Sequence, residues 1–319
     1  MRKAVELGYS EEFAALARAY ERSGGDPSAL ANPGVASLVV SGNRVLGLNS
    51  LPGLDMSAEE LADGIKAHIA VEPGAIIAQP VHFCFGLLPE EGVQRIISHF
   101  KIGPGASVKF LAHCSFPNAV KVRHIMEAEV GKGAAMEYNE AHFHGPAGGA
   151  EVYPHARIAI AEGGSYRSEF KLIQGAVGLL EIEYDVHLEA RAAAELVTKV
   201  HGKGDDRIKI KESLYLEGAQ ARGLVKSRIV LQERAQAEFT GEAIGAGPFS
   251  CGHIDCTEIL GGTEAKAVAV PKLVVVDERA KLTHEAAIGS IDKKELETLM
   301  ARGLSEEEAV EIVVRGLLR

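Results

Sequence analysis

The 319-residue sequence has 44 acidic and 34 basic side chains, a formal net charge of −10. This excess of acids argues against a general nucleic-acid or anionic-membrane surface, because such surfaces depend on lysine and arginine. No apolar run approaches the roughly 18 residues that a membrane helix needs, and the first residues, MRKAVELGYSEEFAALARAY, lack the features of a secretory signal. Four cysteines are too few for a disulfide framework in so long a chain. These features predict a cytoplasmic protein with reduced thiols.

Capping patterns predict helices within residues 1–74, the expected N-terminal helical region. Ser10 precedes a helix with one apolar face, and Ser57 with Glu60 forms a capping pattern ahead of apolar residues at fourfold spacing. The two apolar faces consist of Phe13, Leu16, Ala17 and Tyr20, and of Leu61, Ile65 and Ile69.

Residues 75–284 change to short segments of alternating polarity, which indicate strands. Examples are VKFLAH, RIAIAE, SEFKLI, LLEIEYDVHLEA and SRIVLQERA. Small residues recur at the corners, as at Gly105-Ala106 and Gly133-Ala134, and the absence of Trp suits a narrow interior. This cadence favours a parallel β-helix whose turns stack on one another. A sandwich of hairpins is the alternative, although few hairpin turn dipeptides support it.

The C-terminal region, residues 285–319, is expected to be helical. Asp292 with Glu295 and Ser305 with Glu308 form two capping boxes. The second box leads into a wide apolar arc formed by Ala309, Val310, Ile312, Val313, Val314, Gly316, Leu317 and Leu318. Such an arc must be covered, either by the β domain of the same chain or by another protein.

The stretch CGHIDC, residues 251–256, contains two of the four cysteines. As part of a strand, it directs Cys251, His253 and Asp255 to one side and Ile254 and Cys256 to the other. One metal ion then cannot collect both cysteines and the histidine, and a second Cys/His pair is missing nearby. A zinc clip is therefore disfavoured, and Cys256 is left as a single thiol.

Other clusters are open to two interpretations. His284 and Glu285 form a metal or proton-transfer pair, or a surface hydrogen-bonding corner. Glu140, His142 and His144 share one strand face, which suits a divalent metal or, as we expect, a solvated polar surface. Cys84 and Cys114 each lie beside a His and aromatic residues, and core packing accounts for them.

Motifs for hydrolysis or nucleotide binding are missing. The run GKGDD lacks the Walker spacing, and no G-x-S-x-G or H-E-x-x-H motif occurs. We therefore expect a protein without its own nucleotide or hydrolytic site, that is, not an enzyme.

Three C-terminal blocks resemble the SufB/SufD family, the scaffold proteins of the SUF system for iron–sulfur cluster assembly. The blocks are GHIDCTEIL, KLTHEAAIG and LMARGLSEEEAVEIVVRGLL, and their order and spacing agree with the family over about the last third of the chain. The segments EYNEAHFHG and AHCSFPNAV resemble parts of short archaeal-type members.

The resemblance implies a right-handed parallel β-helix flanked by helical N- and C-terminal regions. It also implies pairing through the β-helices, as a homodimer or as a SufB–SufD type heterodimer. The C-terminal helices would dock an ABC-type ATPase, SufC, through Leu304, Ile312, Val313 and Leu317. Because the chain combines SufB-like residues with the length of a minimal member, we expect a homodimer.

The resemblance further assigns a transient iron–sulfur cluster to Cys256, His284 and Glu285. Thiolate, imidazole and carboxylate together suit a labile cluster that must later be released. Many SufB members have a glutamate where this chain has Thr283. Cys114 is a candidate for sulfur entry, and the sulfur donor stays unknown.

Two other functions compete with the scaffold. A β-helix enzyme acting on a carbohydrate or an acyl group would need stacking platforms, yet aromatic residues make up only 5% of the chain. A pure adaptor that regulates the ATPase would need the C-terminal helix but neither Cys256 nor His284.

Overall fold

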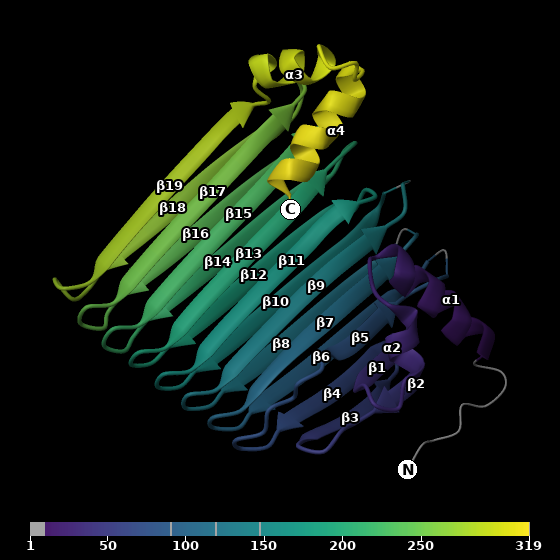
Figure 1. Cartoon of the computed structure of the whole chain (residues 1–319), viewed down its shortest axis with the longest axis vertical. Helices are drawn as coiled ribbons and strands as arrows, with labels where there is room; N and C mark the ends of the chain where they lie inside the picture. The colour runs from purple at the N-terminus through teal and green to yellow at the C-terminus, as the bar shows by residue number, and fades with distance from the viewer. Residues whose placement is uncertain (1–9, 90, 119, 147, 319) are drawn as a thin grey trace.

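The chain folds into a parallel β-helix, which the strand cadence predicted (Figure 1). The computed structural model describes residues 10–89, 91–118, 120–146 and 148–318. Residues 1–9, which belong to the segment compared with a secretory signal, lie outside the described residues. From β5 onward, successive strands alternate between two sheets, so each turn of the solenoid contributes one strand to each sheet.

Within the described residues, one sheet has ten strands and the other has nine. The ten-stranded sheet runs in the order β19 (Lys281–Ser290), β17 (Cys251–Gly261), β15 (Arg222–Gln232), β13 (Ala193–Gly202), β11 (Ser165–Gln174), β9 (Ala135–His144), β7 (Ser107–Phe116), β5 (Val81–Gly86), β1 (Ser37–Ser41), β2 (Arg44–Asn49). The nine-stranded sheet runs in the order β18 (Lys266–Val275), β16 (Gln236–Gly245), β14 (Arg207–Leu216), β12 (Gly178–Leu188), β10 (Ala150–Ile160), β8 (Lys121–Val130), β6 (Val93–Ile102), β4 (Gly64–Val71), β3 (Leu54–Leu61).

Stacked turns place equivalent residues above one another. His253 contacts Thr283, 30 residues later, and this spacing corresponds to one turn. The corners repeat as well, since Gly105, Gly133 and Gly163 have φ values of 68°, 65° and 67°, where a side chain would be strained. Because parallel strands pair in register, a side chain that points inward on one turn lies beside an inward side chain on the next.

The interior is filled by the inward half of each strand. Near the N-terminal end it contains aromatic rings, with Phe110 at 5.4 Å from Phe83 and 5.0 Å from Phe100 between ring centroids. Farther along, aliphatic residues such as Leu214 and Ile254 are fully buried. The core is therefore narrow and continuous along the solenoid.

The N-terminal end of the β-helix is closed by antiparallel pairs, and this corrects the expectation of a helix after Ser57. Ser57 lies in β3 and pairs with His68 of β4, so residues 54–61 and 64–71 form two strands. Ile65 and Ile69 are four residues apart, a spacing that keeps two side chains on one face of a strand as well as of a helix. Ala67, midway between them, is buried as well, and this alternation is that of a strand.

Helices α1 (Ser10–Arg22) and α2 (Pro27–Ala31) cover the outer face of the ten-stranded sheet near β1, β5 and β7 (Figure 1). The helix predicted from Ser10 is thus confirmed. Leu16 and Tyr20 are buried against Cys84, which faces outward from β5.

Two helices follow the last strand, as predicted. Asp292 caps α3 (Lys293–Met300), and Ser305 with Glu308 forms the predicted capping box of α4 (Glu306–Leu317). Residues 285–290 still belong to β19, so the helices begin later than the expected boundary. The division into three domains stays a prediction. Within the described part of the chain, no helix has the length and apolarity to cross a lipid bilayer.

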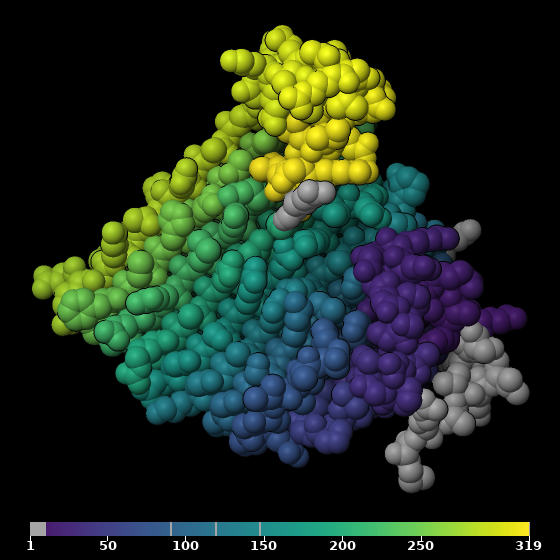
Figure 2. All heavy atoms as spheres, in the orientation of Figure 1, coloured from purple at the N-terminus to yellow at the C-terminus, as the bar shows by residue number. Residues whose placement is uncertain are grey.

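Helix α4 folds back onto the same outer face that α1 and α2 cover at the other end (Figure 2). Val314 and Leu318 are buried, and they pack in one cluster with Val230 of β15 and Ile259 of β17. Part of the predicted apolar arc is therefore covered by the chain's own β-helix.

Candidate functional site

Strand β17 presents CGHIDC as the sequence predicted. Cys251 is exposed, His253 and Asp255 are half-buried on the same outer side, and Ile254 and Cys256 are buried on the inner side. The two cysteines therefore lie on opposite faces of one strand, and no single metal ion can join them.

Cys256 lies one strand from the C-terminal end of the solenoid. Its neighbours across the sheet are Ser227 of β15 and Ala286 of β19. Its side chain is only 1% exposed. Burial raises the pKa of the Cys256 thiol to about 11, and the nearby charges of Glu258 and Asp255 add to the rise. The thiol is therefore protonated at neutral pH, and it releases its proton only when a metal ion binds the sulfur or a base accepts the proton.

Glu258 shares the inner face with Cys256, and the sequence interpretation missed it. It is fully buried, and neither of its side-chain oxygens has a hydrogen-bond partner among the described residues. Burial raises the pKa of the Glu258 carboxyl to about 7. Its position two residues after Cys256, in the same alternation as Ile254, was the available signal.

The structure brings His284 close to Cys256 but places Glu285 on the other face. His284 pairs with Ile254, and Ala286 pairs with Cys256, so His284 points to the inner side of the adjacent strand. Glu285 pairs with Asp255 and therefore points outward. Both His284 and Glu285 are exposed, because β19 ends its sheet within the described chain.

The outer face behind Cys256 has its own polar network. Asp255 accepts hydrogen bonds from the Arg228 guanidinium, which holds the pKa of the Asp255 carboxyl below its usual range. Thr283, at the position where many SufB members have glutamate, lies 2.8 Å from His253 between Oγ1 and Nδ1. These contacts fix β17 between its two neighbours.

The last turn of the solenoid exposes apolar side chains. They are Val268, Val270, Val274 and Val275 of β18, Val276, which follows that strand, and Ile288 of β19. Strands β18 and β19 are the final strands of their sheets in the described chain, so each presents one unpaired edge. An unpaired edge with apolar side chains is a surface that favours pairing with another strand.

The residues predicted to bind a partner differ in how accessible they are. Ile312 is 45% exposed, and Leu304 is half-buried. Val313 and Leu317 pack partly against the cluster that joins α4 to the β-helix. Ile312 is therefore the most accessible of the four.

Glu140, His142 and His144 do not form a solvated face, so that expectation is wrong. All three are buried inside the β-helix, and Glu140 and His142 lie beside Cys114. Burial alone would raise the pKa of the Glu140 carboxyl, but His124 and His142 outweigh it and hold the pKa well below its usual range. Met136 and Tyr138 share the same side of β9, and these apolar neighbours were the signal for an inward face.

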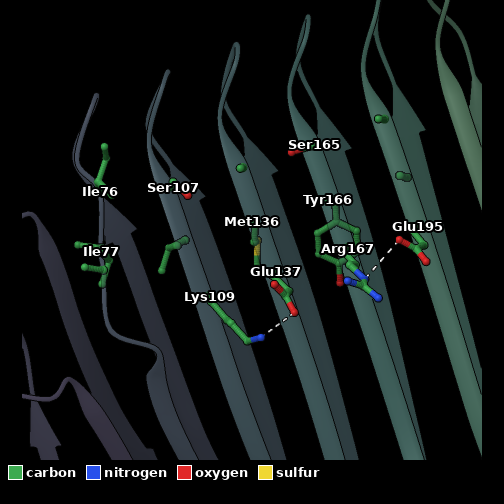
Figure 3. A pocket seen from close by; sticks show the side chains of 15 residues that line it. Ile76, Ile77, Ser107, Lys109, Met136, Glu137, Ser165, Tyr166, Arg167 and Glu195 are labelled. Carbon is green, nitrogen blue, oxygen red and sulfur yellow. Dashed lines mark ion pairs between the residues drawn. The ribbon is translucent and has the colours of Figure 1, made fainter. Parts of the chain in front are cut away.

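A hollow lies at the beginning of β7, β9, β11 and β13 on the outer face of the ten-stranded sheet (Figure 3). Its charged residues pair across adjacent strands. Lys109 Nζ lies 2.9 Å from Glu137 Oε1, and Arg167 Nε lies 3.3 Å from Glu195 Oε2 (Figure 3). Such pairs stabilise neighbouring strands, so we assign no chemistry to this hollow.

Fold and site together define a class: a parallel β-helix with a buried thiol beside an open, apolar terminal turn and a helical pair at its C-terminal end. Residues 92–317 match the family model for the SufBD core domain of SUF system FeS cluster assembly. The chain therefore belongs to the SufBD family of iron–sulfur cluster assembly proteins, as the C-terminal blocks predicted.

Two relatives align along nearly the whole chain. An iron-sulfur cluster assembly SufBD family protein of Pyrococcus horikoshii is 36% identical over 316 residues, covering 98% of this chain and 96% of the relative. A SufBD family protein of Methanocaldococcus jannaschii is 35% identical over 314 residues, covering 98% of this chain and 99% of the relative.

Proposed function

We propose that this protein is a cytoplasmic scaffold on which iron–sulfur clusters are built and from which they are transferred, in complex with a SufC-type ABC ATPase. The cluster is transient cargo held by Cys256, His284 and Glu285. The observation that carries the proposal is the position of Cys256, a single inward thiol one strand from the open end of the solenoid.

The ligand set supports a labile site. Cys256 and His284 lie on the inner side of adjacent strands, and the buried carboxyl of Glu258 lies two residues from the thiol. One thiolate per chain holds a cluster weakly, and two chains related by symmetry would supply a second one. Glu285 points outward at the same exposed edge, so a second chain would have to approach Glu285 from the outer side of the sheet.

Dimerisation through the β-helix is supported by the terminal turn. The unpaired edges of β18 and β19 and their exposed valines favour contact with an equivalent edge of another copy. A SufB–SufD type heterodimer would use the same edge. We favour the homodimer because one chain has both the thiol and the imidazole.

Docking of the ATPase is supported by the outer side of α4. Val314 and Leu318 attach the helix to the β-helix, whereas Ile312 stays exposed. An exposed apolar side chain on an anchored helix is typical of a helix that fills a partner's groove.

Anaerobic reconstitution with iron and sulfide tests the scaffold. The unchanged protein should develop the sulfide-to-iron charge-transfer absorption of an iron–sulfur cluster and should transfer this cluster to an apo-ferredoxin. Cys256→Ala should lose both properties. Cys251→Ala is the matched control, because Cys251 lies on the outer face of the same strand, and it should retain both. An unchanged spectrum in Cys256→Ala would contradict the site.

The same variants distinguish the competing functions. A pure adaptor predicts that α4 is essential for ATPase stimulation while Cys256 and His284 are dispensable. Turnover of a glycan or an acyl ester by the purified chain alone would instead support a β-helix enzyme.

A further inference from the structure

A second group of metal-binding side chains lies inside the β-helix, well away from the open end. Cys114 comes from β7, His124 from β8, and Glu140 and His142 from β9. In its sheet, β9 is separated from β17 by β11, β13 and β15. The group is therefore distinct from the Cys256 site.

The donor atoms converge on one carboxylate oxygen. Glu140 Oε1 lies 2.7 Å from His142 Nε2, 3.4 Å from Cys114 Sγ and 3.5 Å from His124 Nδ1. The donor atoms of Cys114, Glu140 and His142 all lie within 4.8 Å of one another. Bonds of about 2.0–2.3 Å in a tetrahedral site place donors roughly 3.3–3.8 Å apart, so small side-chain shifts are enough to surround an ion.

Neighbouring polar atoms are buried without partners. Among the described residues, Tyr138 Oη and His144 Nδ1 have no hydrogen-bond partner, although the side chains are only 3% and 2% exposed. A small cavity beside the donors is lined by His124, Tyr138 and Glu140, among others. An unpartnered buried hydroxyl on a residue that lines this cavity, that of Tyr138, indicates that the group is incomplete without a ligand.

Packing alone does not account for this choice of residues. A buried carboxylate with two imidazoles is no more stabilising than apolar side chains of similar size, because each polar group loses hydration. A set of donors made of a thiolate, imidazoles and a single carboxylate instead binds borderline divalent transition metals better than it binds magnesium or calcium.

We propose that Cys114, Glu140 and His142 bind one divalent transition metal ion, of the class Fe²⁺, Co²⁺ or Zn²⁺, with His124 as the fourth donor. On binding, the Cys114 thiol releases its proton to solvent, and His142 presents an unprotonated Nε2 to the ion. The oxidation state of the metal does not change. This site does not depend on a cluster at Cys256.

Anaerobic titration of the metal-free, full-length protein with Co²⁺ tests the proposal. We expect one ion per chain, a thiolate-to-cobalt charge-transfer band and the intense visible bands of a tetrahedral site. Cys114→Ser should lose the charge-transfer band, and Glu140→Gln should weaken Co²⁺ binding at least tenfold. Circular dichroism checks that each variant folds. If Cys114→Ser does not fold, the test depends on Glu140→Gln. An unchanged affinity of Glu140→Gln for Co²⁺ overturns the proposal.

Two controls separate this site from the others. Cys84→Ala removes a buried cysteine that faces outward on the adjacent strand β5, and it should keep the cobalt spectrum. Cys256→Ala should also keep it, even though it loses cluster assembly. The proposal is overturned when the unchanged protein shows no thiolate-to-cobalt band, when Cys114→Ser retains the band, or when Cys256→Ala removes it.

Discussion

Arg228 donates two hydrogen bonds to Asp255, at 2.9 Å from Nη1 to Oδ1 and at 2.5 Å from Nη2 to Oδ2. The pair joins β15 to β17 on the outer face behind Cys256, and its side chains are 14% and 23% exposed. Bidentate arginine–carboxylate pairs that are shielded from water are stronger than exposed pairs. The position of the Cys256 strand therefore depends on this contact.

Asp255→Asn should lower the free energy of unfolding by about 1–2 kcal/mol, because it leaves the guanidinium without its counter-charge. Chemical denaturation at neutral pH measures the loss. Asp205→Asn is the matched control, since Asp205 forms a similar bidentate pair with Arg234 at a far more exposed position. That variant should lose clearly less stability than Asp255→Asn, because solvent screens the exposed pair. Equal losses in the two variants would contradict the role assigned to burial.

The thiols of β17 should differ in reactivity. With a pKa of about 11, only about one Cys256 in a thousand is a thiolate at pH 8, and the side chain is enclosed. Cys251 is exposed. Iodoacetamide should therefore label Cys251 well before Cys256 in the native protein, with equal labelling after unfolding. Peptide mass spectrometry follows both sites, and faster labelling of Cys256 would show that its thiol is not enclosed.

Glu212 should make stability depend on pH. Burial raises the pKa of its carboxyl from 4.5 to about 7, and the hydrogen bond from Thr198 offsets only part of this. Between these pH values the folded protein retains a proton that the unfolded chain releases. The contribution of Glu212 to the free energy of unfolding is therefore fully present below pH 4.5 and is lost as the pH rises through 7.

Glu212→Gln stays neutral and should not show this loss. Relative to the unchanged protein, it should gain about 3 kcal/mol between pH 4.5 and pH 8. Denaturation midpoints across this range measure the difference. Glu238→Gln, at an exposed outer position of β16, should follow the unchanged protein throughout. A Glu212→Gln profile parallel to that control would refute the raised pKa.

Substitutions in helix α4 should distinguish the residues that attach it to the β-helix from the residues that bind the ATPase. Val314→Ala removes methyl groups buried against the β-helix and should lower the free energy of unfolding by about 1–3 kcal/mol. Ile312→Asp changes an exposed side chain; it should alter stability by less than about 0.5 kcal/mol but weaken ATPase binding at least tenfold. Thermal melts and calorimetric titration with the ATPase measure the two effects. Undiminished binding by Ile312→Asp would remove that residue from the docking surface.

The terminal turn should determine the oligomeric state. Val270→Lys places a charge on the exposed edge strand β18 and should shift the homodimer to monomer in sedimentation velocity, because burying an unpaired lysine is unfavourable. Val93→Lys is the control at an equally exposed valine of β6, far from that edge, and it should stay dimeric. An unchanged dimer in Val270→Lys would place the interface elsewhere.

The alternation of inward and outward side chains along single strands could be predicted from the sequence. It gave the two faces of β17 correctly. It failed at Ser57 because a spacing of four fits both a helix and a strand, and only the pairing of β3 with β4 distinguishes them. It also failed for Glu140 and His142, because the solvated face was inferred from the polar residues alone, although the apolar Met136 and Tyr138 share that side of β9.

Local patterns in the chain were enough to predict the repeating strands, the caps of the C-terminal helices and the family. Three features depend on how the turns stack: Cys256 lies one strand from the open end, Glu285 points away from it, and Cys114 meets Glu140 and His142 inside the solenoid. Alternation is a local property of the backbone. Contacts between turns depend instead on the number of residues in each turn and on the corners, which set the register between segments about 30 residues apart.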